Sequence, residues 1–439
     1  MATESRATRS DPAPLRLVSF EVADLDRWAF FNPASAACLV TNSKGARALK
    51  QYLKNPGEMD ASGRSFVERL GGTPIMKRVD EAGAFGEVPQ RLIVELTAAC
   101  NLRCRTCYMS AASPRPGELA TEEVLSLLRD AAAAGVETVA FIGGEPFMRA
   151  DLARLTEAAL ESFADVMIST NGTLATEGFL DRFRGRRNLA IQVSLDGPDP
   201  TSNDVIRGRG TFAKAARLLD LAGERGLRTA ISSVLNRKNY SLVGRVCDLG
   251  AQKGCLMTIF HKVHVSGRAQ DSPELLPGKR ELAHGMGVLL EKFGQYEGSG
   301  RMIVDFPHNR CFRGDSTLDA ACLGCYFGRA SAYVTSEGDL ACCSHLREGE
   351  FLCGSVRTRP LAELWQESGK LEELRRMTVD DIPSCRSCDF KYMCRGSCRA
   401  DALGHSGDIK GDPPDCEALR SYYSYVLDYY ARNLEALTP

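Results

Sequence analysis

Three closely spaced cysteines offer the most direct chemistry in this chain. Cys100, Cys104 and Cys107 follow the spacing CxxxCxxC, so one short segment carries three thiols. Three thiolates on one loop can hold three irons of a [4Fe–4S] cluster and leave the fourth iron open to a small molecule. A zinc site with a distant fourth ligand is the other chemistry that this spacing allows. The spacing favours iron–sulfur.

Cysteines gather a second time near the end of the chain. Of the 17 cysteines, only Cys38, Cys247 and Cys255 lie outside the triplet and the segment 311–416. The pattern in that segment is CxxC, then GxxxxC, then CxxCx5Cx3C and a last cysteine: Cys322, Cys325, Gly338, Cys343, Cys385, Cys388, Cys394, Cys398 and Cys416. CxxC pairs also bind zinc readily, so a zinc-ribbon-like module is the alternative.

Composition excludes several classes of protein. There are 55 Lys and Arg against 56 Asp and Glu, and a net charge of −1 argues against a general nucleic-acid binder. No run approaches the ~18–20 apolar residues of a membrane span, and residues 1–16 lack the apolar segment of a secretion signal. We therefore expect a cytoplasmic protein without a membrane partner, in which clustered thiols bind metal rather than form disulfides.

The secondary structure expected around the first three cysteines determines where their thiols lie in the fold. From residue 91 to 261 short apolar runs alternate with amphipathic stretches of helix length, which predicts a parallel sheet covered by helices. The expected strands are 92–97, 138–142, 166–169, 189–195, 229–234 and 256–261. Six such units favour an α/β fold of the partial (β/α)6 barrel type, in which functional residues collect where strands end. His261 and His264 flank the end of the last strand, where they either face the pocket or make ordinary hydrogen bonds.

Short motifs stand at these strand ends, and together they resemble the radical S-adenosylmethionine (radical SAM) superfamily. The cysteine triplet follows the first strand, and the later motifs come in order: Gly143-Gly-Glu-Pro146, Ser169-Thr-Asn-Gly172, Ser194-Leu-Asp-Gly197, Ile206-Arg-Gly208 and Ser266-Gly-Arg-Ala269. One departure is Thr106, because the superfamily usually has an aromatic residue before the last cysteine.

The resemblance implies a mechanism and a set of binding residues. S-adenosylmethionine is cleaved reductively to methionine and a 5′-deoxyadenosyl radical, which takes a hydrogen atom from the substrate, and a reduced flavodoxin- or ferredoxin-type protein supplies the electron. Cys100, Cys104 and Cys107 would hold the catalytic cluster. The residues implied to contact the cofactor are Tyr108, Gly143, Gly144, Glu145, Ser169, Asn171, Ser194, Asp196 and Arg207.

The second group of cysteines resembles the SPASM domain, which carries two auxiliary [4Fe–4S] clusters behind many radical SAM cores. The resemblance implies that one cluster uses Cys322, Cys325, Cys343 and Cys398, and the other Cys385, Cys388, Cys394 and Cys416. Cys311 or Cys342 could replace Cys322, or that iron could stay open. Three [4Fe–4S] clusters and S-adenosylmethionine are thus the expected cofactors.

We expect four parts in the chain. Residues 1–85 form a small α+β module, with strands at 17–22 and 37–41 followed by helices, that suits a winged-helix-like peptide-recognition domain. Residues 86–310 form the radical SAM core, residues 311–420 the SPASM domain, and residues 421–439 a C-terminal helix. A family-specific cap on the barrel is the alternative for the first part.

These features favour an enzyme that modifies a peptide or protein, in particular a ribosomally made precursor peptide, for example by forming a crosslink. One alternative is a maturase that oxidises Cys or Ser to formylglycine, as sulfatase maturases do. Another is a metal-stabilised binding protein without turnover. The residues point to no catalytic base.

Overall fold

The computed structural model describes residues 15–32, 35, 37–76, 86–296, 299–306, 328–436 and 438. Three of the predicted or alternative ligands, Cys311, Cys322 and Cys325, lie outside the described residues. No helix of the described part is long and apolar enough to cross a bilayer.

Six parallel strands form the middle of one ten-stranded sheet. They are β4 (Arg91–Glu95), β5 (Thr138–Ile142), β6 (Asp165–Thr170), β7 (Leu189–Ser194), β8 (Arg228–Leu235) and β9 (Met257–Lys262). Strands of a parallel sheet are covered on both faces, so their residues are apolar in unbroken runs, as in the Val139–Phe141 core of β5. The predicted alternation of strands and helices is confirmed.

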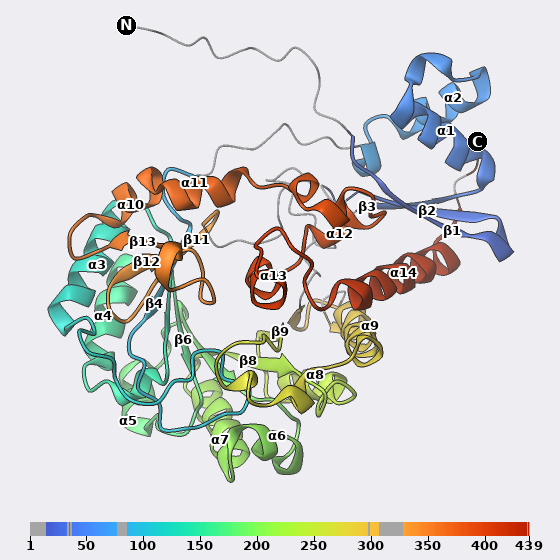
Figure 1. Cartoon of the computed structure of the whole chain (residues 1–439). Helices are drawn as coiled ribbons and strands as arrows, with labels where there is room; N and C mark the ends of the chain where they lie inside the picture. Colours follow the sequence, from blue (N-terminus) through green and yellow to red (C-terminus); the bar gives the residue numbers. More distant parts are fainter. Residues whose placement is uncertain are drawn as a thin grey trace, which may run out of the picture.

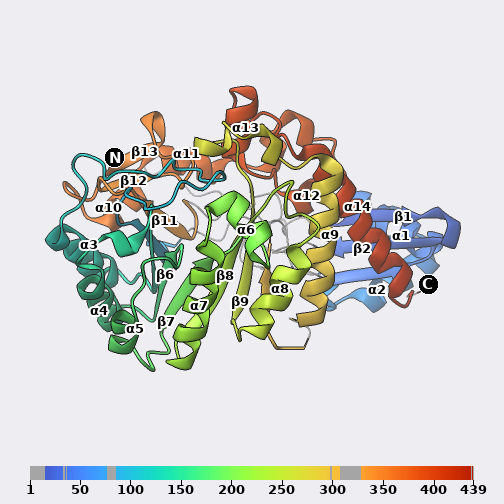
Figure 2. The ribbon, with the colours of Figure 1, turned by 90° about the horizontal axis from the view of Figure 1, so that it is seen from below.

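Helices cover the outside of this curved sheet (Figures 1 and 2). They are α3 (Thr121–Ala133), α4 (Leu152–Ser162), α5 (Glu177–Arg182), α6 (Pro200–Arg207), α7 (Thr211–Glu224), α8 (Val243–Gln252) and α9 (Lys279–Tyr296). Helix α6 was not expected from the sequence. It begins behind Asp199, whose carboxylate accepts from the Ser202 backbone N–H, and it carries Arg207 at its last position.

Four further strands extend the sheet at both edges in the order β10-β9-β8-β7-β6-β5-β4-β11-β12-β13. They are β10 (Ile303–Asp305), β11 (Ser331–Val334), β12 (Asp339–Ala341) and β13 (Leu352–Ser355). β11 pairs in parallel with β4, the strand that leads into the cysteine triplet. The cysteine-rich region is therefore joined to the core by backbone hydrogen bonds.

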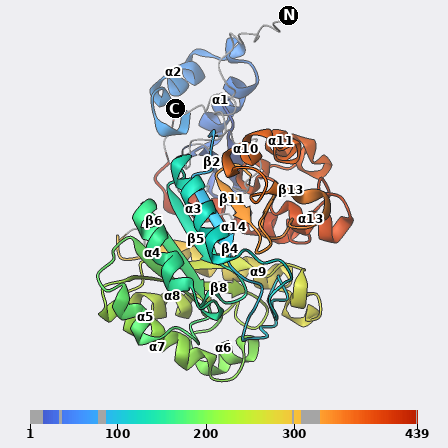
Figure 3. The ribbon, with the colours of Figure 1, turned by 90° about the vertical axis from the view of Figure 1, so that its left-hand side faces the viewer.

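Four short helices complete the cysteine-rich region and lie over one end of the barrel (Figures 1 and 3). They are α10 (Leu361–Glu367), α11 (Gly369–Arg376), α12 (Lys391–Cys394) and α13 (Arg399–Ser406). The long helix α14 (Cys416–Asn433) follows and packs against α9.

A small module precedes the core. It holds the antiparallel sheet β1-β2-β3, of strands β1 (Val18–Val22), β2 (Arg27–Asn32) and β3 (Ala37–Thr41), and the helices α1 (Ser43–Lys54) and α2 (Ala61–Leu70). Alternate residues of β2 face opposite sides: Phe30 packs with α1 and α2, whereas Phe31 belongs to the main core that includes α14. The sheet thus lies between two helical layers, and α14 links it to the rest of the chain.

Candidate active site

The cysteine triplet lies on the loop after β4, and backbone bonds to the next strand's loop hold its start. The Gly144 N–H donates to the Thr97 carbonyl at 2.7 Å, and the Glu145 N–H donates to the Ala99 carbonyl at 2.8 Å. On the other side of the loop, the Cys100 N–H donates to the Ala112 carbonyl at 3.1 Å. The first cysteine is therefore fixed at the carboxyl end of the sheet.

The glycine pair allows this close approach. Gly143 has φ +151°, and a Cβ there would lie 2.4 Å from the Thr97 carbonyl oxygen. A Cβ on Gly144 would lie 2.2 Å from the Ala99 carbonyl oxygen. Either side chain would collide with the cysteine loop's own backbone. This steric reason for the pair is independent of the approach to a cofactor that the sequence suggested.

The Ser266–Ala269 motif holds the same loop from the opposite side. The Arg268 side chain donates to the carbonyls of Cys104 at 2.9 Å and Ala111 at 3.0 Å, and its backbone N–H donates to the Cys107 carbonyl at 3.0 Å. Gly267 has φ +54°, and a Cβ there would meet the Tyr108 carbonyl oxygen at 2.4 Å. The loop is thus clamped between two motifs that are more than 100 residues apart in the sequence.

Charge around the triplet fits a metal cluster. Burial raises the pKa of the Cys100 and Cys104 thiols, and the neighbouring cysteines raise it further. The Leu102 N–H, 3.4 Å from the Cys100 Sγ, and the Arg207 guanidinium near Cys104 act in the opposite direction. Three such thiols become thiolates together when a cationic iron centre binds them. The donor set therefore fits the cluster that the sequence implies.

Glu145 is fully buried and joins two strand ends. Its carboxylate accepts hydrogen bonds from the Thr170 hydroxyl at 2.6 Å and from the backbone N–H groups of Asn171 at 2.7 Å and Phe147 at 3.2 Å. Burial raises the pKa of Glu145, and these three bonds oppose the rise. The Asn171 amide in turn lies 4.0 Å from the Cys100 Sγ. Contact of Glu145 with a cofactor ammonium stays a prediction.

Asp196 and Arg207 form a buried ion pair beside the triplet. The Arg207 Nε lies 2.8 Å from the Asp196 Oδ2, with side chains 11% and 0% exposed. The Val234 N–H donates to the other carboxylate oxygen at 2.7 Å. Although burial alone would lower it, the pKa of Arg207 is raised by Asp196 and by Cys104. Arg207 thus has a carboxylate partner of its own, and its binding of a cofactor carboxylate stays a prediction.

The remaining predicted contact residues lie at the same edge of the sheet. The Ser169 hydroxyl on β6 accepts from the Gln192 side chain at 3.0 Å, and Ser194 is the last residue of β7. Tyr108 lies half-buried with its ring centroid 4.7 Å from that of His345, a residue of the cysteine-rich region. The site thus extends from the barrel into that region.

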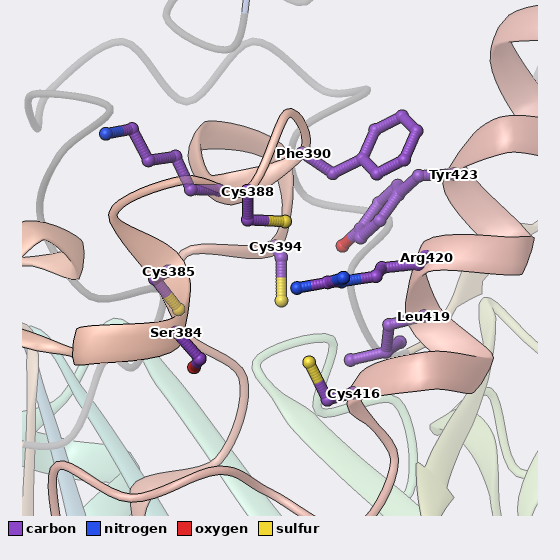
Figure 4. A pocket seen from close by; sticks show the side chains of 10 residues that line it. Ser384, Cys385, Cys388, Phe390, Cys394, Cys416, Leu419, Arg420 and Tyr423 are labelled. Atoms are coloured by element: carbon purple, nitrogen blue, oxygen red, sulfur yellow. The ribbon is translucent and has the colours of Figure 1, made fainter.

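Four of the later thiols line one pocket (Figure 4). These are the four that the sequence assigns to the second auxiliary cluster: Cys385, Cys388, Cys394 and Cys416. Cys385 and Cys388 precede α12, Cys394 is the last residue of α12, and Cys416 is the first residue of α14. Their sulfurs point toward a common centre (Figure 4). The Arg420 guanidinium points into the same space. The donors therefore fit a cluster with four thiolate ligands.

Two of the four thiols assigned to the first auxiliary cluster lie in the described part. The Cys343 Sγ accepts backbone N–H groups of His345 at 3.4 Å and Leu346 at 3.1 Å, an arrangement that stabilises a thiolate. Cys398 lies beside His264 and Asp401, and a hydrogen bond from His264 lowers the pKa of the Cys398 thiol although burial raises it. The Cys342 Sγ lies 3.6 Å from the Cys353 Sγ.

A buried network joins the barrel to these cysteines, and His264 is the one member of it that the sequence analysis named, as a residue that faces the pocket or makes hydrogen bonds. The Lys262 ammonium at the end of β9 lies 2.7 Å from a carboxylate oxygen of Asp401 and 2.7 Å from one of Asp415. Asp401 also binds the His264 Nδ1 at 2.8 Å, and the His264 ring lies 4.0 Å from the His345 ring. The sequence held one sign of this network, because the lysine Lys262 ends the otherwise largely apolar strand β9.

A second buried network lies beside Tyr108. Glu95, the last residue of β4, accepts from the Arg347 guanidinium at 2.7 Å, from the Tyr333 hydroxyl at 2.7 Å and from the Ser336 hydroxyl at 3.3 Å. Three of these residues belong to the cysteine-rich region and one to the core. The two regions are therefore connected through buried charge as well as through strand pairing.

Comparison with protein families agrees with this geometry. Residues 94–248 match the radical SAM superfamily, and residues 325–389 match the SPASM iron–sulfur cluster-binding domain. The chain is an enzyme with a radical SAM domain over residues 94–248. It carries a SPASM domain behind the core, and these two domains bring iron–sulfur clusters and S-adenosylmethionine as cofactors.

Three relatives of similar identity carry the names of three different enzymes. An AdoMet-dependent heme synthase of Nitratidesulfovibrio vulgaris is 28% identical over 340 residues, which are 73% of this chain and 90% of the relative. The mycofactocin maturase MftC of Mycolicibacterium smegmatis is 28% identical over 358 residues, or 78% and 86% of the two chains. The PqqA peptide cyclase of Granulibacter bethesdensis is 29% identical over 338 residues, or 75% and 87%.

Solved structures share the fold. SuiB of Streptococcus suis, bound to S-adenosylmethionine, superposes with a TM-score of 0.63 at 15% identity and covers 93% of this chain and 100% of SuiB. The enzyme anSMEcpe with bound AdoMet superposes with a TM-score of 0.64 at 19% identity and covers 79% and 100%. The SuiB match leaves out fewer residues than Val18–Leu70 contain, so it extends into the small N-terminal module.

Proposed function

We propose that this enzyme modifies a peptide, in particular a ribosomally made precursor peptide, and installs a bond such as a crosslink. The observation that carries the proposal is the combination of a radical SAM core, a SPASM domain and the N-terminal module in one fold that SuiB shares almost throughout. SuiB has also been crystallised with its precursor peptide SuiA, and two relatives are named a mycofactocin maturase and a PqqA peptide cyclase.

Three [4Fe–4S] clusters are part of the proposal. Cys100, Cys104 and Cys107 would hold the first, and the four thiols of the pocket in Figure 4 would hold the third. Cys343 and Cys398 would serve the second, together with Cys322 and Cys325. When bound, the first cluster and S-adenosylmethionine supply a radical that removes a hydrogen atom from an unactivated carbon.

The chain's own residues position that chemistry. The glycine pair and Arg268 fix the cysteine loop at the carboxyl end of the sheet. We propose that Glu145 and Arg207, each already held by buried partners, present their remaining hydrogen-bonding capacity to the cofactor's amino and carboxylate groups. Side chains that are fixed before the cofactor binds lose little entropy when it arrives.

The electron balance requires outside partners. A reduced flavodoxin- or ferredoxin-type protein would supply the electron for reductive cleavage. Crosslinking a peptide removes two hydrogens: one leaves as an atom on 5′-deoxyadenosine, and the other leaves as a proton. The electron that remains requires an acceptor, and an auxiliary cluster held by Cys385, Cys388, Cys394 and Cys416 would supply that capacity.

Haem formation is the second candidate, because two relatives that are 28% and 25% identical are named heme synthases. The two candidates predict different products from one experiment. Purified, anaerobically reconstituted enzyme is incubated with S-adenosylmethionine and with dithionite as the reductant. One reaction contains a synthetic peptide with the sequence of the short open reading frame nearest to this gene in the genome, and the other contains an iron-bearing haem precursor. Release of 5′-deoxyadenosine with a mass decrease in the peptide supports peptide maturation; conversion of the haem precursor alone would contradict it.

Two controls make that result specific. The Cys107→Ala variant should release no 5′-deoxyadenosine. Cys255→Ala, which alters a thiol just before the amino end of β9 and thus at the opposite edge of the sheet from the cysteine loop, should match the unmodified enzyme. Metal analysis accompanies the assay. About twelve irons and twelve sulfides per chain support three clusters, whereas about four irons with two zincs would refute the auxiliary clusters.

A further inference from the structure

The outer edge of β3 carries a neighbour from the far end of the chain. β3 is an edge strand of the small sheet, since the order is β1-β2-β3. Val40 on β3 forms a parallel bridge with Ala436, which lies beyond the end of α14. Nearly 400 residues separate the two in the sequence, so the pairing is not a consequence of local folding.

Two arginines of the module hold the backbone that follows α14, which the structure describes at residues 434–436 and 438. The Arg69 side chain on α2 donates to the Thr438 carbonyl at 2.7 Å. The Arg27 side chain on β2 donates to the carbonyls of Ala431 at 3.0 Å and Leu434 at 3.2 Å, where α14 ends. The segment is therefore bound through its backbone, by groups that read no side chain.

The edge of this sheet is suited to an extended chain. Its two faces are already covered, by α1 and α2 on one side and by α14 on the other. An edge strand presents N–H and C=O groups that pair with any added strand, and peptides are captured in this way by many proteins. Backbone pairing combined with an arginine aimed at a carbonyl describes a site for extended peptide.

We infer that residues 434–436 and 438 cover the outer edge of β3 beside Arg69 in cis, as an autoinhibitory segment that belongs to the chain itself. A peptide substrate must then displace this segment before the module can hold it. The inference rests on the proposed function only for the identity of the natural competitor. The chain's own segment reduces the binding of other peptides to the edge of β3, because a tethered ligand competes with them at high effective concentration.

Removal of the segment should expose the site. The full enzyme is compared with a variant that lacks residues 434–439, which leaves α14 complete. The probe is a fluorescein-labelled synthetic peptide of residues 430–439, followed by fluorescence anisotropy. A segment seated in about 90% of molecules weakens binding in trans about tenfold, so the shortened variant should bind the probe about ten times more tightly.

Hydrogen exchange provides a measurement that needs no probe. The amides of β3 should exchange faster in the shortened variant, whereas those of α1 should be unchanged if the module stays folded. The full-length variant Ala436→Pro should show the same change, because proline disturbs a bridged position without shortening the chain. In the shortened variant, Arg69→Ala should lower probe affinity, and Glu68→Ala, its exposed neighbour, should not.

Equal probe binding by the full and shortened proteins, or unchanged β3 exchange in both variants, would overturn the inference. Failure of the proposed function would look different. In that case the probe would still bind the shortened variant, but no peptide would be modified in the radical assay. Conversely, turnover of a peptide by an enzyme whose β3 edge never binds the probe would reject only the inference.

Discussion

Replacement of Lys262 by methionine should weaken the junction between the core and the SPASM domain. The Lys262 ammonium lies 2.7 Å from both Asp401 and Asp415, and the three side chains are only 10%, 6% and 9% exposed. The change removes the cation that both buried carboxylates share. Asp401 keeps His264, and Asp415 keeps the Ser397 hydroxyl at 3.4 Å.

The expected magnitude follows from this geometry. Breaking a buried ion pair by removing one partner costs about 3–5 kcal/mol, because the remaining charge has no compensation. The hydrogen bond from His264 and the charge of Lys262 hold the pKa of Asp401 well below its usual range although burial raises it, so this carboxylate stays ionised at neutral pH. We expect a loss near the lower end of that range, about 3 kcal/mol, because Asp401 and Asp415 each retain one partner.

Hydrogen exchange is the appropriate assay, since a chain with several domains does not unfold in one step. At about 3 kcal/mol, exchange of protected amides in α13 and the first turns of α14 should accelerate about a hundredfold. Lys253→Met is the matched control, because the Lys253–Asp220 pair lies at the surface, where such pairs contribute about 0–1 kcal/mol. The double variant Lys262→Met/Asp401→Asn should recover part of the loss. Equal exchange in Lys262→Met and Lys253→Met would refute the reasoning.

Of three further predictions, two concern the cysteine loop and its supports, and the third concerns the ion pair of Glu123 with Arg357 at the start of α3. Gly144→Ala would place a Cβ 2.2 Å from the Ala99 carbonyl oxygen, so we expect a folded protein that has lost about a third of its iron; full iron content would contradict the packing argument. Arg268→Met leaves two loop carbonyls without their donor at about 1–3 kcal/mol each, and should speed iron loss to a chelator, whereas an unchanged rate would exclude a clamping role. Hydrogen bonds from Arg357 and from a backbone N–H lower the pKa of Glu123 to about 2, so its stabilisation is present above about pH 4.5 and is lost as the pH falls toward 2. Hydrogen exchange of the first turn of α3 should therefore differ between Glu123→Gln and the unmodified protein most at neutral pH; a difference that grew in acid would contradict this pH dependence.

The strands could be predicted from the sequence because their apolar runs are short and bounded by motif residues. Each of the six core strands lies within two residues of its expected position. Helix α6 escaped prediction because only Asn203 and Ile206 are buried on it, so it lacks an apolar periodicity. Asp199 followed by Pro200 marks the start of this helix, but the same pair of residues is equally typical of a turn.

The site could be predicted in its ligands but not in its supports. The resemblance to the SPASM pattern assigns Cys385, Cys388, Cys394 and Cys416 to one cluster, and the structure places all four around one pocket. The partners of Lys262 could not be read from the sequence, because they stand more than 130 residues away. Buried charges reveal their partners only once the fold brings them together.

Strand β4 fixes the position of the SPASM domain relative to the cysteine loop of the radical SAM core. Its backbone pairs with β11, its last residue Glu95 binds Arg347 and Tyr333, and the next turn leads into the cysteine loop. Any rotation of the SPASM domain would have to break a strand pair and two buried charge networks at once. Electron transfer falls steeply with distance, so a proposed auxiliary cluster serves as acceptor only if its separation from the first is constant. The fold secures that constancy through β4 at one end and Lys262 at the other.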